Sequence, residues 1–296
     1  MKHAKNAVGL LIGPLVAMGV ASGTHAHAQS TWLVSNDPAE NPDFASLESA
    51  LASAGVQHGD TIEISQGLAE YLVFATVNKS VTIRAQGGEQ PVLRPGAAIR
   101  VLIGGVTLQG LTFRPNAENP AVLASPAPST IRDCRFEDFR LTSLTVLMNP
   151  GSLITGCEFE NCATVQTNHG MLIVPLSTVE DCTFTTTDSP THPGAQVSGE
   201  GLVVRNSTFV GGKFAHTAIT LVSNVQRYIG CSFRDSNSPS QFTAGQLNGY
   251  TFDGCLFDNV HAQSALINAF DKNIAIRNCT IVNCSAAALA DGSIVS

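Results

Sequence analysis

The sequence predicts an all-β protein, a single-stranded parallel solenoid of about nine coils with a repeat of ~24 residues. Three observations predict this fold. A six-residue pattern ending in Cys-x-Phe recurs along the chain, and a residue type that tolerates a left-handed backbone precedes the Cys column in every repeat. No 3.6-residue periodicity runs through these segments, which argues against helices.

The first element is an export signal. Lys2 and Lys5 precede an apolar run from Ala7 to Ala21, and small residues stand three and one positions before Gln29. This order is typical of a secretory signal peptide, and the run is shorter than the roughly 20 residues that span a membrane. We therefore expect residues 1–28 to be a signal peptide. The exported protein would lie outside the cell, at its surface, or in the periplasm or outer membrane of a Gram-negative cell.

The second element, residues 29–56, is expected to cap the solenoid. A short amphipathic helix is expected to begin at Asp43 as N-cap and to stop at Gly55. Its apolar residues at helical spacing are Phe44, Leu47, Leu51 and Ala54. Solenoids need such a cap, because the first coil otherwise exposes its apolar interior.

The third element, residues 57–296, is expected to form the coils. "GDTIEI" at 59–64 opens the stack, and earlier coils lie around Ile83 and Leu108. The repeats then align on one column with spacings of 23, 23, 25, 25, 24, 24 and 24: Leu111, Cys134, Cys157, Cys182, Ser207, Cys231, Cys255 and Cys279. Stacked parallel coils place equivalent side chains on top of one another, about 4.8 Å apart.

Two bends are expected in each coil. The position before the Cys column is always Gly, Asp or Asn, which tolerate the left-handed backbone region. These residues are Gly110, Asp133, Gly156, Asp181, Asn206, Gly230, Gly254 and Asn278. A second column of the same types holds Asp138, Asn161, Gly211, Asp235, Asn259 and Asn283.

The cysteines are expected to be part of the core. Cys and Phe positions are two apart and so face the same side of a strand, the interior. The core ladder comprises Cys134, Cys157, Cys182, Cys231, Cys255 and Cys279, while Cys162 and Cys284 share another column. Reduced packing thiols are favoured, because a small buried residue fits this column. A ladder disulfide stays open, although parallel Cβ directions suit its torsion poorly. We expect no metal site and no cofactor.

The charged residues between core positions are expected to face solvent. Column by column they meet opposite charges: Arg114 with Glu137, Arg135 with Glu158, Glu180 with Arg205, and Arg234 with Asp258. A functional alternative is a carboxylate site for glycosidic chemistry, formed by Glu137, Glu158 and Glu160 on one outer face. Such chemistry needs an acid and a base about 5 to 9.5 Å apart.

A histidine column gives a further candidate site. His169, His192 and His216 are spaced by 23 and 24 residues, each just before the strand that opens the next coil. Three imidazoles on consecutive coils could hold a transition metal or line a sugar-binding groove. The alternative is a solvated turn that tolerates histidine. The catalytic residues themselves are not identified by any motif.

Composition narrows the partners. The formal charge is −7, only 13% of residues are charged, and no basic run occurs, so nucleic acid is not expected. No later segment is apolar for long enough to cross a membrane, so the mature chain is expected to lack a transmembrane segment. Because the sequence stops just after the last coil, we expect its C-terminal end to pack on another chain or on a missing segment.

The chain resembles the right-handed parallel β-helix proteins of the pectin-lyase-like class. The resemblance is carried by "TWLVSNDPAENPDFASLESALASAGVQHGDTIEISQG" and by the recurrent "NCTF"-type coils, over roughly residues 31–290. A looser resemblance is to polymorphic outer-membrane and autotransporter-type surface proteins. The first class includes polysaccharide lyases, hydrolases, epimerases, tailspikes and adhesins, so the fold does not choose a function.

We expect an exported, non-catalytic, adhesin-like binding protein that recognises a polysaccharide, cell-surface glycans or other surface partners. The alternative is a polysaccharide lyase or glycoside hydrolase with its site beside the histidine column, at the loops 164–170, 186–194 and 211–217. A third reading is the N-terminal fragment of a larger surface protein.

Overall fold

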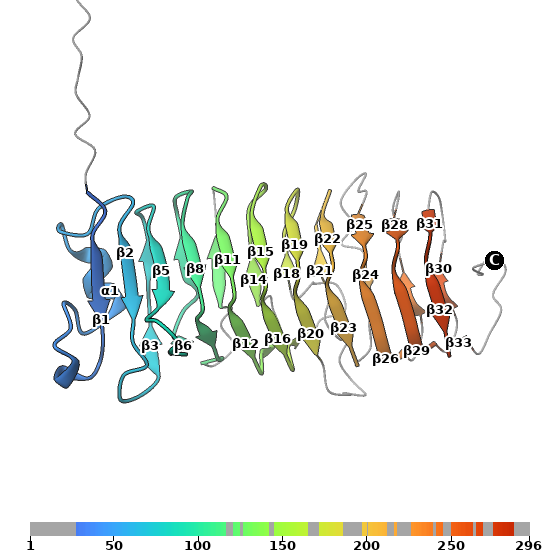
Figure 1. Cartoon of the computed structure of the whole chain (residues 1–296), viewed down its shortest axis with the longest axis horizontal. Helices are drawn as coiled ribbons and strands as arrows, with labels where there is room; N and C mark the ends of the chain where they lie inside the picture. The colour runs from blue at the N-terminus through green and yellow to red at the C-terminus, as the bar shows by residue number, and fades with distance from the viewer. Residues whose placement is uncertain are drawn as a thin grey trace, which may run out of the picture.

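The protein is an elongated solenoid of parallel strands that stack from the N-terminal end to the C-terminal end (Figure 1). The computed structural model describes residues 28–116, 121–124, 127–141, 145–164, 172–185, 197–199, 201–211, 216–217, 226–238, 241–244, 250–262, 265–268 and 275–286. Each coil contributes one strand to each of two long sheets, and several contribute a third strand to a shorter sheet. The predicted fold class is confirmed.

Sheet A runs the full length of the stack and has eleven strands among the described residues. In spatial order they are β1 (Thr31–Val34), β2 (Thr61–Ile64), β5 (Thr82–Ala85), β8 (Thr107–Gln109), β11 (Thr130–Arg132), β15 (Leu153–Thr155), β19 (Thr178–Glu180), β22 (Val203–Arg205), β25 (Gln226–Ile229), β28 (Tyr250–Asp253) and β31 (Ala275–Arg277). The coil count therefore differs slightly from the expected value of about nine.

Sheet B follows sheet A in each coil. Its strands are β3 (Tyr71–Val73), β6 (Val92–Pro95), β9 (Thr112–Phe113), β12 (Arg135–Glu137), β16 (Glu158–Glu160), β20 (Thr183–Thr185), β23 (Thr208–Val210), β26 (Ser232–Ser238), β29 (Leu256–Ala262) and β32 (Thr280–Val282), with β33 (Ser285–Ala286) also paired to β29. Its outer face is the one that matters for the candidate site.

The third side of the coil is built from shorter strands. Sheet C holds β4 (Thr76–Val77), β7 (Ile99–Val101), β10 (Val122–Ala124), β14 (Val146–Leu147), β18 (Leu172–Ile173) and β21 (Val197–Ser198). Two smaller sheets pair β13 (Arg140–Leu141) with β17 (Ala163–Thr164), and β24 (His216–Thr217) with β27 (Gln241–Ala244) and β30 (Ala265–Asn268).

The interior is a set of in-register ladders. Phe136 pairs with Phe159, and Phe159 with Phe184, in neighbouring strands of sheet B. Their rings stack with centroids 4.7 and 4.8 Å apart and interplanar angles of 5° and 7°. Stacked aromatics at the strand spacing bury large apolar area and disfavour a shift in register. The predicted stack is confirmed.

Both bend columns are confirmed. Every described member of each column has a positive φ, from 48° at Asn206 to 71° at Gly211. Asparagine side chains also link the bends: Asn161 Nδ2 donates to Asp138 Oδ1 (3.3 Å), and Asn259 Nδ2 donates to Asp235 Oδ1 (2.7 Å). The bends therefore combine a left-handed backbone with side-chain ladders across coils.

The N-terminal cap contains the 3-10 helix η1 (Pro38–Glu40) and the helix α1 (Leu47–Ala52). The capping helix was predicted, but its start was wrong. Ser46 is the N-cap and forms a capping box with Ser49, whereas the Asp43 carboxylate accepts the N–H of Leu33 (2.8 Å). Phe44 forms a parallel bridge to Val34, so this part of the chain pairs with sheet A. The helix therefore begins later in the sequence than predicted.

All eight cysteines are free. Cys134, Cys157 and Cys182 are buried in successive coils, and their thiols point at backbone carbonyls, as in Cys182 Sγ–Glu180 O (3.2 Å). Burial raises the pKa of Cys162 to about 12, and a hydrogen bond with Cys157, together with burial, raises the pKa of Cys182. The thiols therefore pack as small apolar groups.

Buried thiols whose pKa is raised, such as those of Cys162 and Cys182, should be almost unreactive in the folded protein. A raised pKa lowers the thiolate fraction at pH 8, and reactivity returns only as pH rises toward the raised value or as the protein unfolds. A hydrogen bond with Cys255 instead lowers the pKa of Cys231, and burial is what keeps reagents from that thiol.

We expect Cys279 and Cys284, which are half-buried, to react first with a thiol reagent. Unreduced protein in denaturant should show 8 thiols. A titre of six or fewer would contradict the reduced ladder.

Candidate functional site

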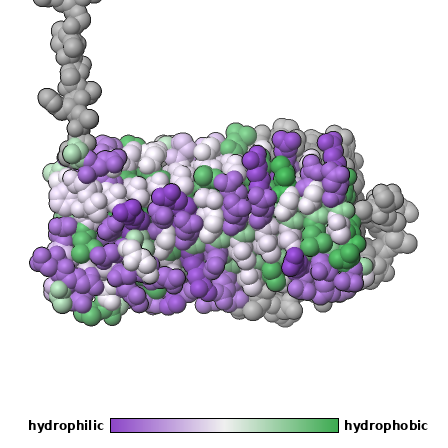
Figure 2. Space-filling model, in the orientation of Figure 1, coloured by the Kyte–Doolittle hydropathy of each residue, from purple (hydrophilic) through white to green (hydrophobic). Residues whose placement is uncertain are grey.

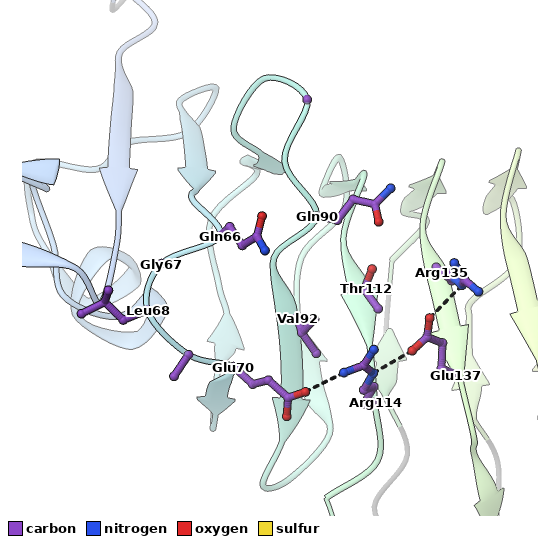
Figure 3. A pocket seen from close by; sticks show the side chains of 12 residues that line it. Gln66, Gly67, Leu68, Glu70, Gln90, Val92, Thr112, Arg114, Arg135 and Glu137 are labelled. Atoms are coloured by element: carbon purple, nitrogen blue, oxygen red, sulfur yellow. Dashed lines mark hydrogen bonds and ion pairs between the residues drawn. The ribbon is translucent and has the colours of Figure 1, made fainter.

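A groove lies on the outer face of sheet B, at the N-terminal end of the stack (Figure 3). Its volume is about 630 Å³, and it is partly open to solvent. The lining residues come from β6, β9 and β12 and from two loops: Gln66, Gly67, Leu68, Ala69, Glu70, Gly88, Gln90, Val92, Thr112, Arg114, Arg135 and Glu137. Hydrophilic residues gather over the neighbouring strands β12 and β16 in the space-filling view (Figure 2).

The groove forms because two coils break the repeat. From β8 onward sheet A passes to sheet B through a short bend, but residues 65–70 and 86–91 form longer loops before β3 and β6. Asn36 holds the first loop, since its Oδ1 accepts the N–H of Leu68 (2.7 Å) and its Nδ2 donates to Ala69 O (2.8 Å). Glu89 Oε2 accepts the N–H of Gln66 (2.5 Å), which joins the two loops.

A row of ion pairs crosses the groove floor. Arg114 Nη1 lies 2.7 Å from Glu70 Oε1, and Arg114 Nε lies 2.7 Å from Glu137 Oε2. Glu137 Oε1 in turn lies 2.8 Å from Arg135 Nε. The side chains point toward one another along the solenoid axis (Figure 3). Each carboxylate is therefore held between the coils, and the row fixes the positions of the polar groups in the groove.

The ion pairs stabilise the charged form of both arginines. Hydrogen bonds to Glu137 and Glu70 raise the pKa of Arg114, and the hydrogen bond to Glu160 raises the pKa of Arg135. Because these side chains are partly exposed, the pairs contribute little to stability and mainly set orientation.

The three predicted carboxylates do lie together. Glu137, Glu158 and Glu160 all surround Arg135: Glu158 Oε2 is 3.7 Å from its Nε, and Glu160 Oε2 contacts its Nη2. Glu137 and Glu160 contact guanidinium donors of Arg135, whereas Glu158 comes no closer than 3.7 Å. A carboxylate that contacts a guanidinium group is poorly placed to exchange a proton with a sugar.

The predicted charge ladder is confirmed only in part: Arg114 pairs with Glu137 and Arg135 approaches Glu158. The described side chains of Glu180 and Arg205, and of Arg234 and Asp258, lie in register without an ion pair between them.

The histidine column cannot be assembled from the described structure. His169 and His192 lie outside the described residues. The backbone of His216 lies in β24 and pairs with Thr243 of β27, which places it on the third side of the coil. This location is distinct from the groove over sheet B.

Within the described part of the chain, no group of three or more His, Cys, Asp or Glu side chains could hold a metal ion. None of the helices among these residues has the length and apolar character needed to cross a membrane. A second hollow, of about 410 Å³, lies on the other side of the loop 86–91, between Arg84 and Gln109.

The sequence reasoning missed most of the groove. It identified Glu137 but not Gln66, Gln90 or Thr112. The signal that could have found them is the break in the repeat at 65–70 and 86–91, where the bend column is replaced by Gly-rich and Gln-rich loops. Loops that interrupt a regular scaffold commonly carry its function.

The stacked parallel strands define a parallel β-helix, and a groove lies on the outer face of sheet B. The chain belongs to the right-handed β-helix family, whose description "Right handed beta helix region" matches residues 79–233. No curated protein matches the chain in sequence.

One solved structure, a pectate lyase, supports this fold. It is 12% identical with a TM-score of 0.55, covering 91% of this chain and 83% of that one. A PL6 family alginate lyase is 15% identical with a TM-score of 0.49, covering 86% of this chain and 39% of the lyase. The chain is thus a right-handed parallel β-helix, the fold that it shares with the pectate lyase.

Proposed function

We propose that this protein is an exported, non-catalytic β-helix protein that binds carbohydrate in the groove over β6, β9 and β12. The observation that carries the proposal is an open groove of about 630 Å³ whose charged floor groups are already paired. Gln66, Gln90 and Thr112 add amide and hydroxyl groups that can exchange hydrogen bonds with sugar hydroxyls.

The cellular setting completes the proposal. The expected signal peptide at residues 1–28 would place the protein at the cell surface or outside the cell, where an adhesin-like protein meets glycans. The fold that it shares with a pectate lyase supports a carbohydrate partner by analogy.

Removing the groove amides should weaken binding. In the double variant Gln66→Ala/Gln90→Ala, affinity for a glycan found on an array is expected to fall about thirtyfold, since each of the two lost hydrogen bonds costs about 1 kcal/mol. Calorimetric titration measures the change. The matched control is Thr183→Ala, an exposed residue of β20 on the same outer face, which should bind normally. Equal affinity in all three proteins would place the site elsewhere.

An assay for turnover distinguishes the proposed binding protein from the alternative, a polysaccharide lyase or glycoside hydrolase. We expect no unsaturated products from polyuronides and no new reducing ends from neutral glycans. Turnover that His192→Ala abolishes would overturn the non-catalytic proposal and place the chemistry at the histidine column. Turnover abolished by Glu137→Gln would place it in the groove.

A further inference from the structure

Phe74 is an aromatic side chain on the outside of the solenoid. Outward residues alternate with buried ones from Glu70 to Val77, and Phe74 is one of the outward set. Its side chain is 58% exposed, whereas the phenylalanines of the interior stack are buried. A large exposed aromatic group is costly to solvate unless it serves a contact.

The next coil fixes the position of this ring. A Cβ atom added at Gly96 would lie 2.2 Å from Phe74 Cζ and 2.4 Å from Cε1, so the ring lies directly over the Gly96 backbone. The backbone beneath it is fixed as well: Gly96 N donates to Val73 O (2.7 Å), and Phe74 N donates to Glu48 Oε1 (2.6 Å). The glycine thus makes room for a flat aromatic plate with one side open to solvent.

The plate continues the groove along the strand direction. Glu70, Leu72 and Phe74 project from the same side of the chain around β3, and Glu70 lines the groove. Four residues of strand span roughly 13 Å, so the Phe74 ring lies at about this distance from Glu70. A short oligosaccharide is long enough to contact both residues. Leu72 is 57% exposed and lies between them. The outer face therefore offers a polar groove and then an apolar platform.

The charges on this face argue against an acidic ligand. Arg94, Arg114 and Arg135 face Glu70, Glu137, Glu158 and Glu160, so three arginines meet four glutamates and the row carries a formal charge of −1. A polyuronide would have to compete with these glutamates for every guanidinium group. An uncharged glycan needs no such exchange.

We propose that Phe74 is a sugar-stacking platform and that the ligand is an uncharged glycan with an equatorially linked, gluco-configured backbone. Such a pyranose presents a face of C–H bonds, polarised by the neighbouring oxygens, which is attracted to the negative face of an aromatic ring. The platform fixes one sugar ring, while the groove takes the hydroxyl groups of the units beyond it. This inference rests on the proposed carbohydrate binding and specifies its ligand class.

The test compares four variants of the full chain by calorimetric titration. The ligands are β-1,4-linked glucan and N-acetylglucosamine oligosaccharides, and the acidic oligogalacturonate and oligomannuronate. Phe74→Ala should weaken binding of the neutral oligosaccharides at least about fivefold, and Phe74→Trp should retain it. Gly96→Ala keeps the aromatic ring but displaces it, and should weaken binding as Phe74→Ala does. Leu102→Ala, an exposed apolar residue elsewhere, is the control and should bind normally.

The outcomes separate this inference from the proposed function. Preferential binding of the acidic oligosaccharides, or neutral binding that Phe74→Ala leaves unchanged, overturns the platform while carbohydrate binding stands. Binding of no glycan overturns both. If the wild type self-associates and Phe74→Ala abolishes this, the Phe74 ring serves a protein contact, and the sugar-stacking platform is overturned.

Discussion

Replacing Phe159 by alanine is expected to lower the free energy of unfolding by about 3–5 kcal/mol. The ring is buried between Phe136 and Phe184, with centroid distances of 4.7 and 4.8 Å. Its removal loses transfer free energy and leaves a cavity in the middle of the stack, where the coils on both sides restrain collapse. Urea unfolding followed by far-ultraviolet circular dichroism measures the loss.

The matched control is Phe74→Ala, which removes the same side chain from the outer surface. Its free energy of unfolding should change by no more than about 0.5 kcal/mol, because surface substitutions rarely cost more. Equal losses for the two variants would contradict the assignment of Phe159 to the core. If Phe159→Ala fails to fold, Phe159→Leu should still show a measurable loss, since it keeps most of the volume.

Replacing Asp60 by alanine is expected to lower the free energy of unfolding by about 3 kcal/mol or more, since it removes a buried carboxylate that accepts three hydrogen bonds. The Asp60 side chain is 0% exposed. Its carboxylate accepts the N–H groups of Ser30 and Gln57, both at 2.9 Å, and Trp32 Nε1 at 3.0 Å. These bonds join β1 and the cap to the first full coil, so the variant should lose the N-terminal end of the stack first.

Two measurements check the Asp60 prediction. Asp60→Asn keeps one acceptor oxygen and should lose less stability than Asp60→Ala. Trp32 fluorescence reports the cap directly, and its unfolding midpoint in Asp60→Ala should fall below the midpoint seen by circular dichroism. Coincident, wild-type-like midpoints would show that the Asp60 hydrogen bonds do not hold the cap.

The coils could be predicted from the sequence because every repeat must meet the same physical requirements with the same types of residue. A bend needs a residue that tolerates positive φ, and both predicted columns have it, as at Asp133 (54°) and Gly254 (64°). The stack needs one large apolar residue every ~24 positions, and the phenylalanine column provides it. Each of these residue preferences is weak at a single position, but their recurrence in every repeat predicts the fold strongly.

The cap and the groove could be predicted only in part because they are where the repeat fails. The helix begins at Leu47, after the N-cap Ser46, because Phe44 before it bridges to Val34 of sheet A. Local capping rules do not contain this tertiary contact.

The groove depends on how Asn36 and Glu89 hold two loops, contacts between residues 32 and 23 positions apart in sequence. Its ion pairs were partly predictable, because Arg114 and Glu137 occupy the same column of adjacent coils.

The most direct test of the proposed carbohydrate binding is hydrogen–deuterium exchange of the full chain with and without a glycan that binds it. The structure predicts protection in residues 65–70, 71–74 and 86–94, which form the groove wall and the Phe74 platform. Protection confined to the loops at 164–170, 186–194 and 211–217, with none at the groove, would contradict the account and move the site to the histidine column.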